Sequence, residues 1–226
     1  MSAGKLFVVA TPIGNLSDLS ARAIETLRQV KAVACEDTRV SRKIFSHIGA
    51  APELISYHQY SSEAAVERIR SRLAVGDDVA LVTDAGTPGI SDPGGRLVEA
   101  LAQDFEIVPI PGASAVTAIL SVAGLPADRF LFLAYPPHKK GRAKYFARVA
   151  ESPDTVVFYE SPHRIGKTLK QLATACKDAP ARRLVVGREL TKMFETIYRG
   201  QVGEAETLVP EKDFRGEFVI VIEGSK

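Results

Sequence analysis

The chain has 226 residues, of which 46% are hydrophobic and 25% charged, with a formal net charge of +2. This is the composition of an ordinary globular protein, long enough for one large domain or two small ones. Two cysteines, Cys35 and Cys176, exclude a disulfide framework and a cysteine-cluster metal site, and four dispersed histidines lack metal-ligand spacing. No apolar run approaches about 18 residues and the N-terminus lacks a signal-peptide pattern, so we expect a cytoplasmic protein without a membrane span or a metal.

Short apolar runs alternate with segments of helical periodicity through residues 1–125. The predicted strands are 5–10, 32–35, 54–57, 79–82 and 107–110. Apolar residues between them recur at helical spacing, for example over 93–103. Repeated strand–helix units form parallel sheets with right-handed crossovers, so we expect an N-terminal α/β domain with a parallel sheet and flanking helices.

The pattern changes in the second half of the chain. The predicted strands there are 130–134, 155–159, 184–187, 195–199 and 217–223, with a helix over 162–175. Little helix separates the third and fourth of them, which predicts a mixed, partly antiparallel sheet in a C-terminal α/β domain. Charge shifts as well, from a net −3 over 1–125 (11 Lys+Arg, 14 Asp+Glu) to +5 over 126–226 (18 and 13). We therefore predict two domains, 1–125 and 126–226.

The most informative segment is VALVTDAGTPGISDPGG, residues 79–95. An apolar strand is followed at once by Asp84 and a loop with four glycines and two prolines. Glycine lets the backbone approach a ligand closely, and proline keeps a loop stiff. Open α/β sheets bind ligands where strands end in such loops, so this loop predicts a binding site.

Polar or Gly-rich segments follow the other four strands of the first half as well. They are TPIGN at 11–15, CEDTR at 35–39, YH at 57–58 and GASA at 112–115. None is a G-x-G-x-x-G dinucleotide fingerprint or a P-loop. Because parallel strands end at one edge of a sheet, their convergence indicates one site at that edge.

Basic residues gather in three places in the second half. One cluster surrounds HKKGR at 138–142, one includes His163 and Arg164, and one includes Arg188. From composition alone, a solvated surface and a footprint for an anionic polymer are both open.

Seven segments occur in the order found in one family: TPIGNLSDLS, ACEDTR, VTDAGTPGISDPG, PIPGASA, YESPHR, RELTK and RGEFVIVI. On these motifs, spanning about residues 5–224, the chain resembles the ribosomal RNA small-subunit methyltransferase I group of the tetrapyrrole (corrin/porphyrin) methylase superfamily. The resemblance implies a two-domain enzyme, usually a homodimer, that transfers a methyl group from S-adenosylmethionine to the ribose 2′-oxygen of a cytidine in small-subunit ribosomal RNA. The resemblance also implies a small further segment that helps to hold RNA, because family members commonly continue beyond the position that corresponds to Lys226.

The resemblance also implies where the cofactor binds, in a cleft between the two domains. Carried over by motif, the cofactor-binding residues are Pro12, Asp84, Gly86, Thr87, Pro88, Gly89, Ile90, Ser91, Ser114, Ala115, Tyr135, Leu190, Gly216 and Glu217. Adenine requires apolar walls, and the amino-acid end of the cofactor requires N–H donors and a carboxylate, which agrees with these loops.

A ribose hydroxyl must lose its proton to become a good nucleophile, and a general base or a cation can assist. Our candidates for this catalytic role are Glu36, Asp37 and Lys192. Phosphate contacts are expected from basic side chains. The candidate RNA-binding residues are Arg39, Lys139, Lys140, Arg142, His163, Arg164 and Arg188.

Two alternatives remain open from the sequence. The first is a methylase of the same superfamily that acts on a tetrapyrrole or on a modified protein histidine. A flat apolar cavity would favour a tetrapyrrole, whereas CEDTR, YESPHR and RELTK favour RNA. The second is a non-catalytic RNA-binding protein that keeps the fold, which would bind ribosomal particles without turning over cofactor.

Overall fold

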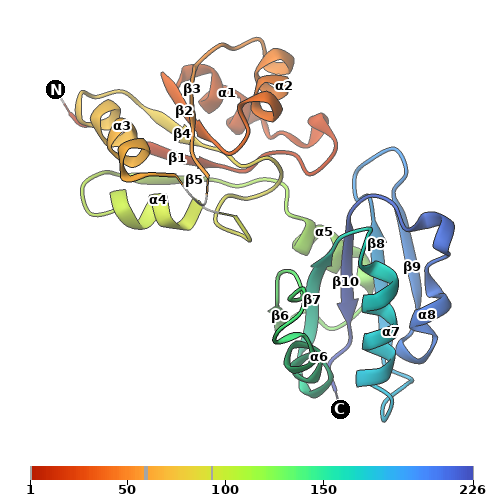
Figure 1. Ribbon diagram of the computed structural model, residues 1–226. Coiled ribbons are helices and arrows are strands. Elements are labelled where there is room, and N and C mark those ends of the chain that lie inside the picture. Colours follow the sequence, from red (N-terminus) through yellow and green to blue (C-terminus); the bar gives the residue numbers. More distant parts are fainter. Residues whose placement is uncertain (1, 59–60, 93, 226) are drawn as a thin grey trace. The chain divides into compact units, whose positions relative to one another are not determined.

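The computed structural model describes residues 2–58, 61–92 and 94–225, which form two compact units, 1–114 and 115–226. Each unit is built around one five-stranded sheet (Figure 1). The sequence placed the boundary at 125, one helix later. That helix, Ala115–Ala123, follows the last strand of the first half after a short loop, so the strand–helix pattern alone assigns it to the first domain.

The first unit holds a wholly parallel sheet in the order β3-β2-β4-β1-β5, which confirms the predicted parallel α/β architecture. Its strands are β1 (Leu6–Val9), β2 (Ala32–Cys35), β3 (Glu53–Ser56), β4 (Val79–Leu81) and β5 (Ile107–Ile110). Its helices are α1 (Ala21–Gln29), α2 (Thr38–Ile48), α3 (Glu63–Ala74) and α4 (Gly94–Leu101). The expected helix over 93–103 corresponds to α4, and Pro93 lies outside the described residues.

Alternation along the strands explains why helices cover both faces of this sheet. In β2, Val33 and Cys35 pack with α1 and α2, whereas Ala32 and Ala34 pack with α3 and α4. All four residues are fully buried. Successive side chains of a strand point to opposite faces, so a strand that is apolar throughout requires a helical layer on each side. All five strands consequently end at one edge, as the loop pattern predicted.

The second unit holds a mixed sheet in the order β6-β7-β10-β8-β9, as the sequence predicted. Its strands are β6 (Phe130–Phe132), β7 (Thr155–Glu160), β8 (Arg183–Arg188), β9 (Thr196–Gln201) and β10 (Phe218–Ile222). Within this second sheet, as far as the structure describes it, only the β6–β7 pair is parallel. Its helices are α5 (Ala115–Ala123), α6 (Arg142–Glu151), α7 (Ile165–Ala175) and α8 (Ala205–Leu208).

Helices α6, α7 and α8 cover one face of the second sheet, where Phe158, Phe218 and Ile220 form a buried core with Leu169 and Leu172. Helix α5 packs on the other face, against β10. Helices α6 and α8 are not among the elements predicted from the sequence. Among the described residues, no helix is both long and apolar enough to cross a membrane.

Candidate active site

Three loops at the carboxyl edge of the first sheet are tied together by hydrogen bonds. The backbones of Thr11 and Gly86 form an isolated antiparallel bridge, with N···O distances of 2.9 and 3.1 Å. The Thr11 hydroxyl donates to the carbonyl of Thr83 at 3.0 Å, and the Thr87 hydroxyl donates to the carbonyl of Ala113 at 3.2 Å. The predicted cofactor segments after β1, β4 and β5 are therefore brought to one place.

Backbone conformation in these loops depends on glycine. Gly86 and Gly89 have φ of +88° and +89°, in the left-handed region that side chains rarely adopt. At Gly112 a Cβ would lie 3.0 Å from that of Ala10, tighter than ordinary contact. Ser91 also has a positive φ, +65°, which a non-glycine residue adopts only when the surrounding structure enforces it.

Asp92 holds the Gly-rich loop in shape. Its Oδ1 accepts hydrogen bonds from the backbone N–H groups of Gly89, at 2.6 Å, and Gly94, at 2.9 Å. Ile90 at the tip of the loop is 47% exposed. The loop therefore offers an apolar side chain, hydroxyls and the Asp84 carboxylate around a glycine backbone, which fits a ligand with both apolar and charged parts. Thr11 and Asp92 were not among the predicted site residues, although the TPIGN segment and the Gly-rich loop contain them. In the sequence, Asp92 directly before Pro93 has the pattern of a helix N-cap.

Glu36 and Asp37, both candidate catalytic residues, lie directly after β2. Asp37 is the N-cap of α2, and its carboxylate also pairs with the guanidinium of Arg39 at 2.6 Å. Its backbone N–H donates to Oδ1 of Asp84 at 3.1 Å. The hydrogen bonds from Arg39 lower the pKa of Asp37 to about 2. Burial, together with the charges of Asp84 and Asp92, raises the pKa of Glu36.

The second unit brings a further set of predicted residues together, at the β8–β9 turn. Lys192 Nζ lies 2.9 Å from Glu189 Oε1 and 2.7 Å from Glu217 Oε2. The backbone N–H of Glu217 donates to Glu189 Oε1 at 2.9 Å. Leu190, which follows Glu189 in the sequence, is buried, with 7% of its surface exposed. Partial burial disfavours the ammonium form, but the hydrogen bonds from Lys192 to the two glutamates outweigh it and raise the pKa of Lys192. A lysine held in this way is a cation and not a general base.

Two unusual backbone positions support a functional role for this turn. Glu189 and Thr191 have positive φ, +50° and +67°, without being glycine. Gly216, with φ of +77°, lies directly against the Glu189 side chain, where a Cβ would collide with the carboxyl group. Strained residues of this kind are concentrated at ligand-binding and catalytic sites. Sequence reasoning missed Glu189 although it lies within the RELTK motif.

Tyr135, another predicted cofactor residue, follows β6 and packs against Tyr159 of β7 with ring centroids 5.4 Å apart. Burial, and next the charges of Glu217 and Glu160, raise the pKa of Tyr135. The hydroxyl therefore stays protonated at neutral pH and is available as a hydrogen-bond donor.

The candidate RNA-binding residues fall into two groups. Lys139, Lys140 and His163 are exposed, as is Arg39. The structure departs from expectation at Arg142, which is only 5% exposed and donates to Gln171, Pro137 and Thr168.

Arg164 and Arg188 are also committed to protein partners. Arg164 pairs with buried Glu160 at 2.8 Å, and Arg188 donates to the carbonyls of Arg215 and Phe194. The prediction of a phosphate contact is therefore wrong in its placement for Arg142, which is buried. Its guanidinium donates its hydrogen bonds to Gln171, Pro137 and Thr168 instead.

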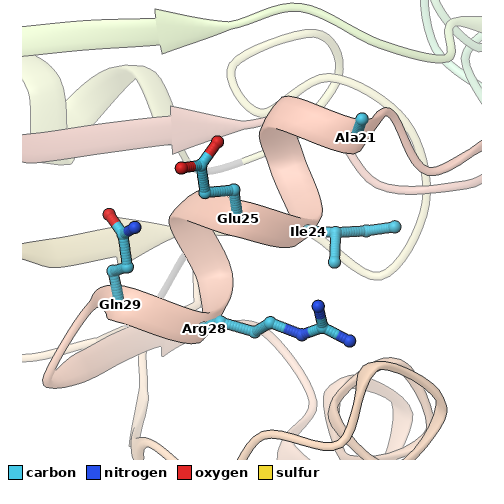
Figure 2. Close-up of a pocket in the computed structure, with 5 residues that line it drawn as sticks. All are labelled: Ala21, Ile24, Glu25, Arg28 and Gln29. Atoms are coloured by element: carbon cyan, nitrogen blue, oxygen red, sulfur yellow. The ribbon is translucent and has the colours of Figure 1, made fainter.

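A pocket of about 320 Å³ lies on the surface of α1 (Figure 2). All its lining residues come from this one helix, Ala21, Ile24, Glu25, Arg28 and Gln29. Glu25 and Gln29 point to one side of the helix and Ile24 and Arg28 to another, so the side chains do not converge on a ligand. None of the predicted site residues lines it. Among the described residues, no three His, Cys, Asp or Glu side chains are grouped to hold a metal ion.

Comparison with known proteins now identifies the class. Residues 5–206 match the family described as Tetrapyrrole (Corrin/Porphyrin) Methylases. The fold is similar to that of the methyltransferase CobJ, with a TM-score of 0.71, 19% identity and coverage of 99% of this chain and 95% of that one. It is also similar to a uroporphyrin-III C-methyltransferase from Thermus thermophilus solved with S-adenosylhomocysteine, with a TM-score of 0.63, 19% identity and coverage of 96% and 97%. The protein is therefore a methyltransferase of this family.

Sequence identity is higher to proteins named ribosomal RNA small subunit methyltransferase I than to these solved structures. A Pseudomonas aeruginosa protein named ribosomal RNA small subunit methyltransferase I is 46% identical over 99% of this chain and 80% of its own length. The protein of that name from Escherichia coli O157:H7 is 40% identical over 100% of this chain and 79% of its own. The chain belongs to the ribosomal RNA small subunit methyltransferase I family.

Proposed function

We propose that this protein transfers the methyl group of S-adenosylmethionine to the ribose 2′-oxygen of a cytidine in small-subunit ribosomal RNA. The observation that carries the proposal is the 40–46% identity, over nearly the whole chain, to proteins named for that RNA. The tied loops of the first unit and the strained turn of the second fall on VTDAGTPGISDPG and RELTK, two of the motifs that carry the resemblance to that family.

For the cofactor, we propose contacts from both units. In the first unit these are Pro12, the loop 84–91 and the segment at Ser114 and Ala115. In the second unit they are Tyr135, Leu190 and the segment at Gly216 and Glu217. Loops with glycine at positive φ, an exposed isoleucine and a nearby carboxylate support this assignment in the first unit.

The chemistry assigned to the chain's own residues is positioning and proton removal. Bound S-adenosylmethionine supplies the methyl group and leaves as a neutral thioether. Of the two adjacent carboxylates, Glu36 is the better general base, since its raised pKa makes it more basic than Asp37, which Arg39 keeps ionised. Lys192, protonated between Glu189 and Glu217, is suited to stabilising negative charge that develops on the ribose oxygen.

For the RNA, we propose phosphate contacts from exposed cations, above all Lys139 and Lys140 on the loop before α6. The same proposal covers Arg39 and His163, which are exposed, and Arg188 at the edge of the turn. We also propose that the enzyme acts in the cytoplasm as a homodimer on small ribosomal subunits. The family resemblance supports these three statements.

The test is transfer of labelled methyl groups from S-adenosylmethionine by the full chain. Small ribosomal subunits that lack 2′-O-methylation and a tetrapyrrole precursor are offered in parallel, with a heat-denatured enzyme as control. We expect label in the RNA and none in the tetrapyrrole. Label in the tetrapyrrole alone would replace this proposal with the alternative function in the superfamily.

A further inference from the structure

A buried carboxylate at the end of β7 organises a network of side chains. The Glu160 side chain is 0% exposed; its Oε1 accepts a hydrogen bond from the Ser161 backbone at 2.7 Å and forms an ion pair with Arg164 Nη2 at 2.8 Å. The Thr168 hydroxyl donates to Oε2 at 2.5 Å, and Arg142 Nη2 lies 3.8 Å from the same oxygen. A carboxylate without water is stable only when it is paired and hydrogen-bonded as this one is.

The two arginines on Glu160 reach in turn to one loop. Arg164 Nη1 donates to the carbonyl of Pro136 at 2.9 Å, and Arg142 Nη1 donates to the carbonyl of Pro137 at 3.0 Å. Proline has no N–H group, so this segment cannot form a regular backbone ladder with a neighbour. The guanidinium groups satisfy its carbonyls instead and fix the loop between β6 and α6 to the buried glutamate.

This loop carries the side chains with the strongest claim to contact substrate. Tyr135 lies at its start, next to Pro136, and His138, Lys139 and Lys140 are exposed at its far end. Gly141, with φ of +86°, then turns the chain into α6. The orientation of the lysines is therefore set by the segment that the arginines hold.

We propose that Arg164 and Arg142, held by Glu160, are positioning residues that present Lys139 and Lys140 to the phosphates of the RNA. Arg164 and Arg142 act through the loop and do not themselves contact the RNA. This inference rests on the proposed function for its substrate. It also explains why two arginines expected at an RNA surface have side chains that are only 17% and 5% exposed.

A double-mutant cycle separates positioning from direct contact. Arg164→Lys keeps a positive charge beside Glu160 but loses the planar fork that reaches both Glu160 and Pro136. We expect it to raise the KM for RNA about three- to tenfold, as weakening of one or two phosphate contacts would, while kcat at saturating RNA is unchanged. In the Lys139→Ala/Lys140→Ala background, Arg164→Lys should raise KM no further. A further rise of the same factor there would show that Arg164 contacts RNA directly and would overturn the inference.

Hydrogen exchange provides a readout that needs no RNA. The amides of Arg142 and Tyr145, which donate to the carbonyls of Lys139 and Gly141, should exchange faster in Arg164→Lys than in the wild type, while those of β7 remain equally protected. Unchanged exchange at Arg142 and Tyr145 would overturn the inference even if KM had risen. The matched control is Arg129→Lys, at an exposed ion pair with Asp154, which should change neither quantity. Failure of the wild type to methylate RNA would contradict the proposed function, whereas the exchange result would still decide whether Arg164 orders the loop.

Discussion

Glu36 and Asp37 are adjacent in the sequence, yet their surroundings change their proton affinities in opposite directions. Arg39 donates to both carboxylate oxygens of Asp37 and lowers its pKa to about 2. The pKa of Glu36 is instead raised, mainly by partial burial and next by the negative charges of Asp84 and Asp92. The same pair of acids thus holds one stable anion and one group that can exchange a proton.

A pH profile distinguishes their roles. If Glu36 is the general base, kcat falls as the pH falls through its raised pKa, because the protonated acid cannot accept a proton. Glu36→Gln should lower kcat by about 100-fold and abolish this acidic limb. Asp37→Asn should leave the limb in place, since asparagine is an equally good N-cap and only the charge is removed. An acidic limb that persists in Glu36→Gln would contradict the assignment.

Acidification also removes stability through Asp37, but over a lower pH range than the loss of activity through Glu36. Its pKa is lower in the folded protein than the value of about 3.9 in an unfolded chain. The pairing with Arg39 therefore contributes stability above that unfolded value and loses it as the pH falls towards 2. The acidic limb of activity follows the raised pKa of Glu36, at a higher pH than this loss.

Gly216 offers a test of the turn that contains Glu189. Gly216→Ala places a methyl group against the Glu189 carboxyl group and requires a φ of +77°. We expect a loss of stability of more than about 1 kcal/mol, measured by chemical denaturation, together with weaker S-adenosylmethionine binding by calorimetry.

Gly49→Ala is the matched control for Gly216→Ala. Its φ is +68°, but no atom lies within 4 Å of the added Cβ. It should therefore show the cost of the backbone conformation alone, with cofactor affinity unchanged. Equal behaviour of the two variants in both measurements would show that contact with Glu189 is unimportant.

At the scale of elements, the sequence predicted the strands more fully than the helices of the second half. Strands such as 32–35 and 107–110 are short apolar runs, and the structure places β2 and β5 at those residues. Helix α6 was not predicted because its buried stripe consists of Arg142, Phe146 and Val149. An arginine in that stripe does not count as apolar in a periodicity argument, and it is buried only because Glu160 and Thr168 lie beside it.

The same limit applies to the candidate site. Residues after the strands of the first unit could be grouped from sequence, because parallel strands must end at one edge. The pairing of Lys192 with Glu189 and Glu217 could not, because it depends on the contact between two loops 25 residues apart in sequence. Without that contact, Lys192 was as good a candidate for a base as for a cation.

The loop between β6 and α6 is predicted to bind RNA phosphates through Lys139 and Lys140. Charge reversal of its lysines, Lys139→Glu with Lys140→Glu, should weaken RNA binding by at least tenfold. The slope of log K against log salt should fall by about 0.7 for each phosphate that the loop no longer neutralises. S-adenosylmethionine affinity should not change, since neither lysine is among the proposed cofactor contacts. A fall in cofactor affinity equal to that in RNA affinity, or no effect on RNA, would contradict a phosphate-binding role for this loop.

At the scale of the whole molecule, charge is divided between the two units. Residues 115–125, AVTAILSVAGL, contain no charged side chain, so the division at 114 gives the same net charges, −3 and +5, as the predicted boundary at 125. A methyltransferase needs one site for its cofactor and, for this substrate, a surface for an anionic polymer. We expect the positive second unit, with the exposed lysines before α6, to supply that surface.

The central claim is the atom that receives the methyl group. It is tested most directly by digesting the RNA of treated small subunits to nucleosides and locating the label by mass spectrometry. We expect label in 2′-O-methylcytidine, with an initial rate about 100-fold lower in Glu36→Gln and retained in Asp37→Asn. Label on a nucleobase, or on the 2′-oxygen of another nucleoside alone, would contradict the claim.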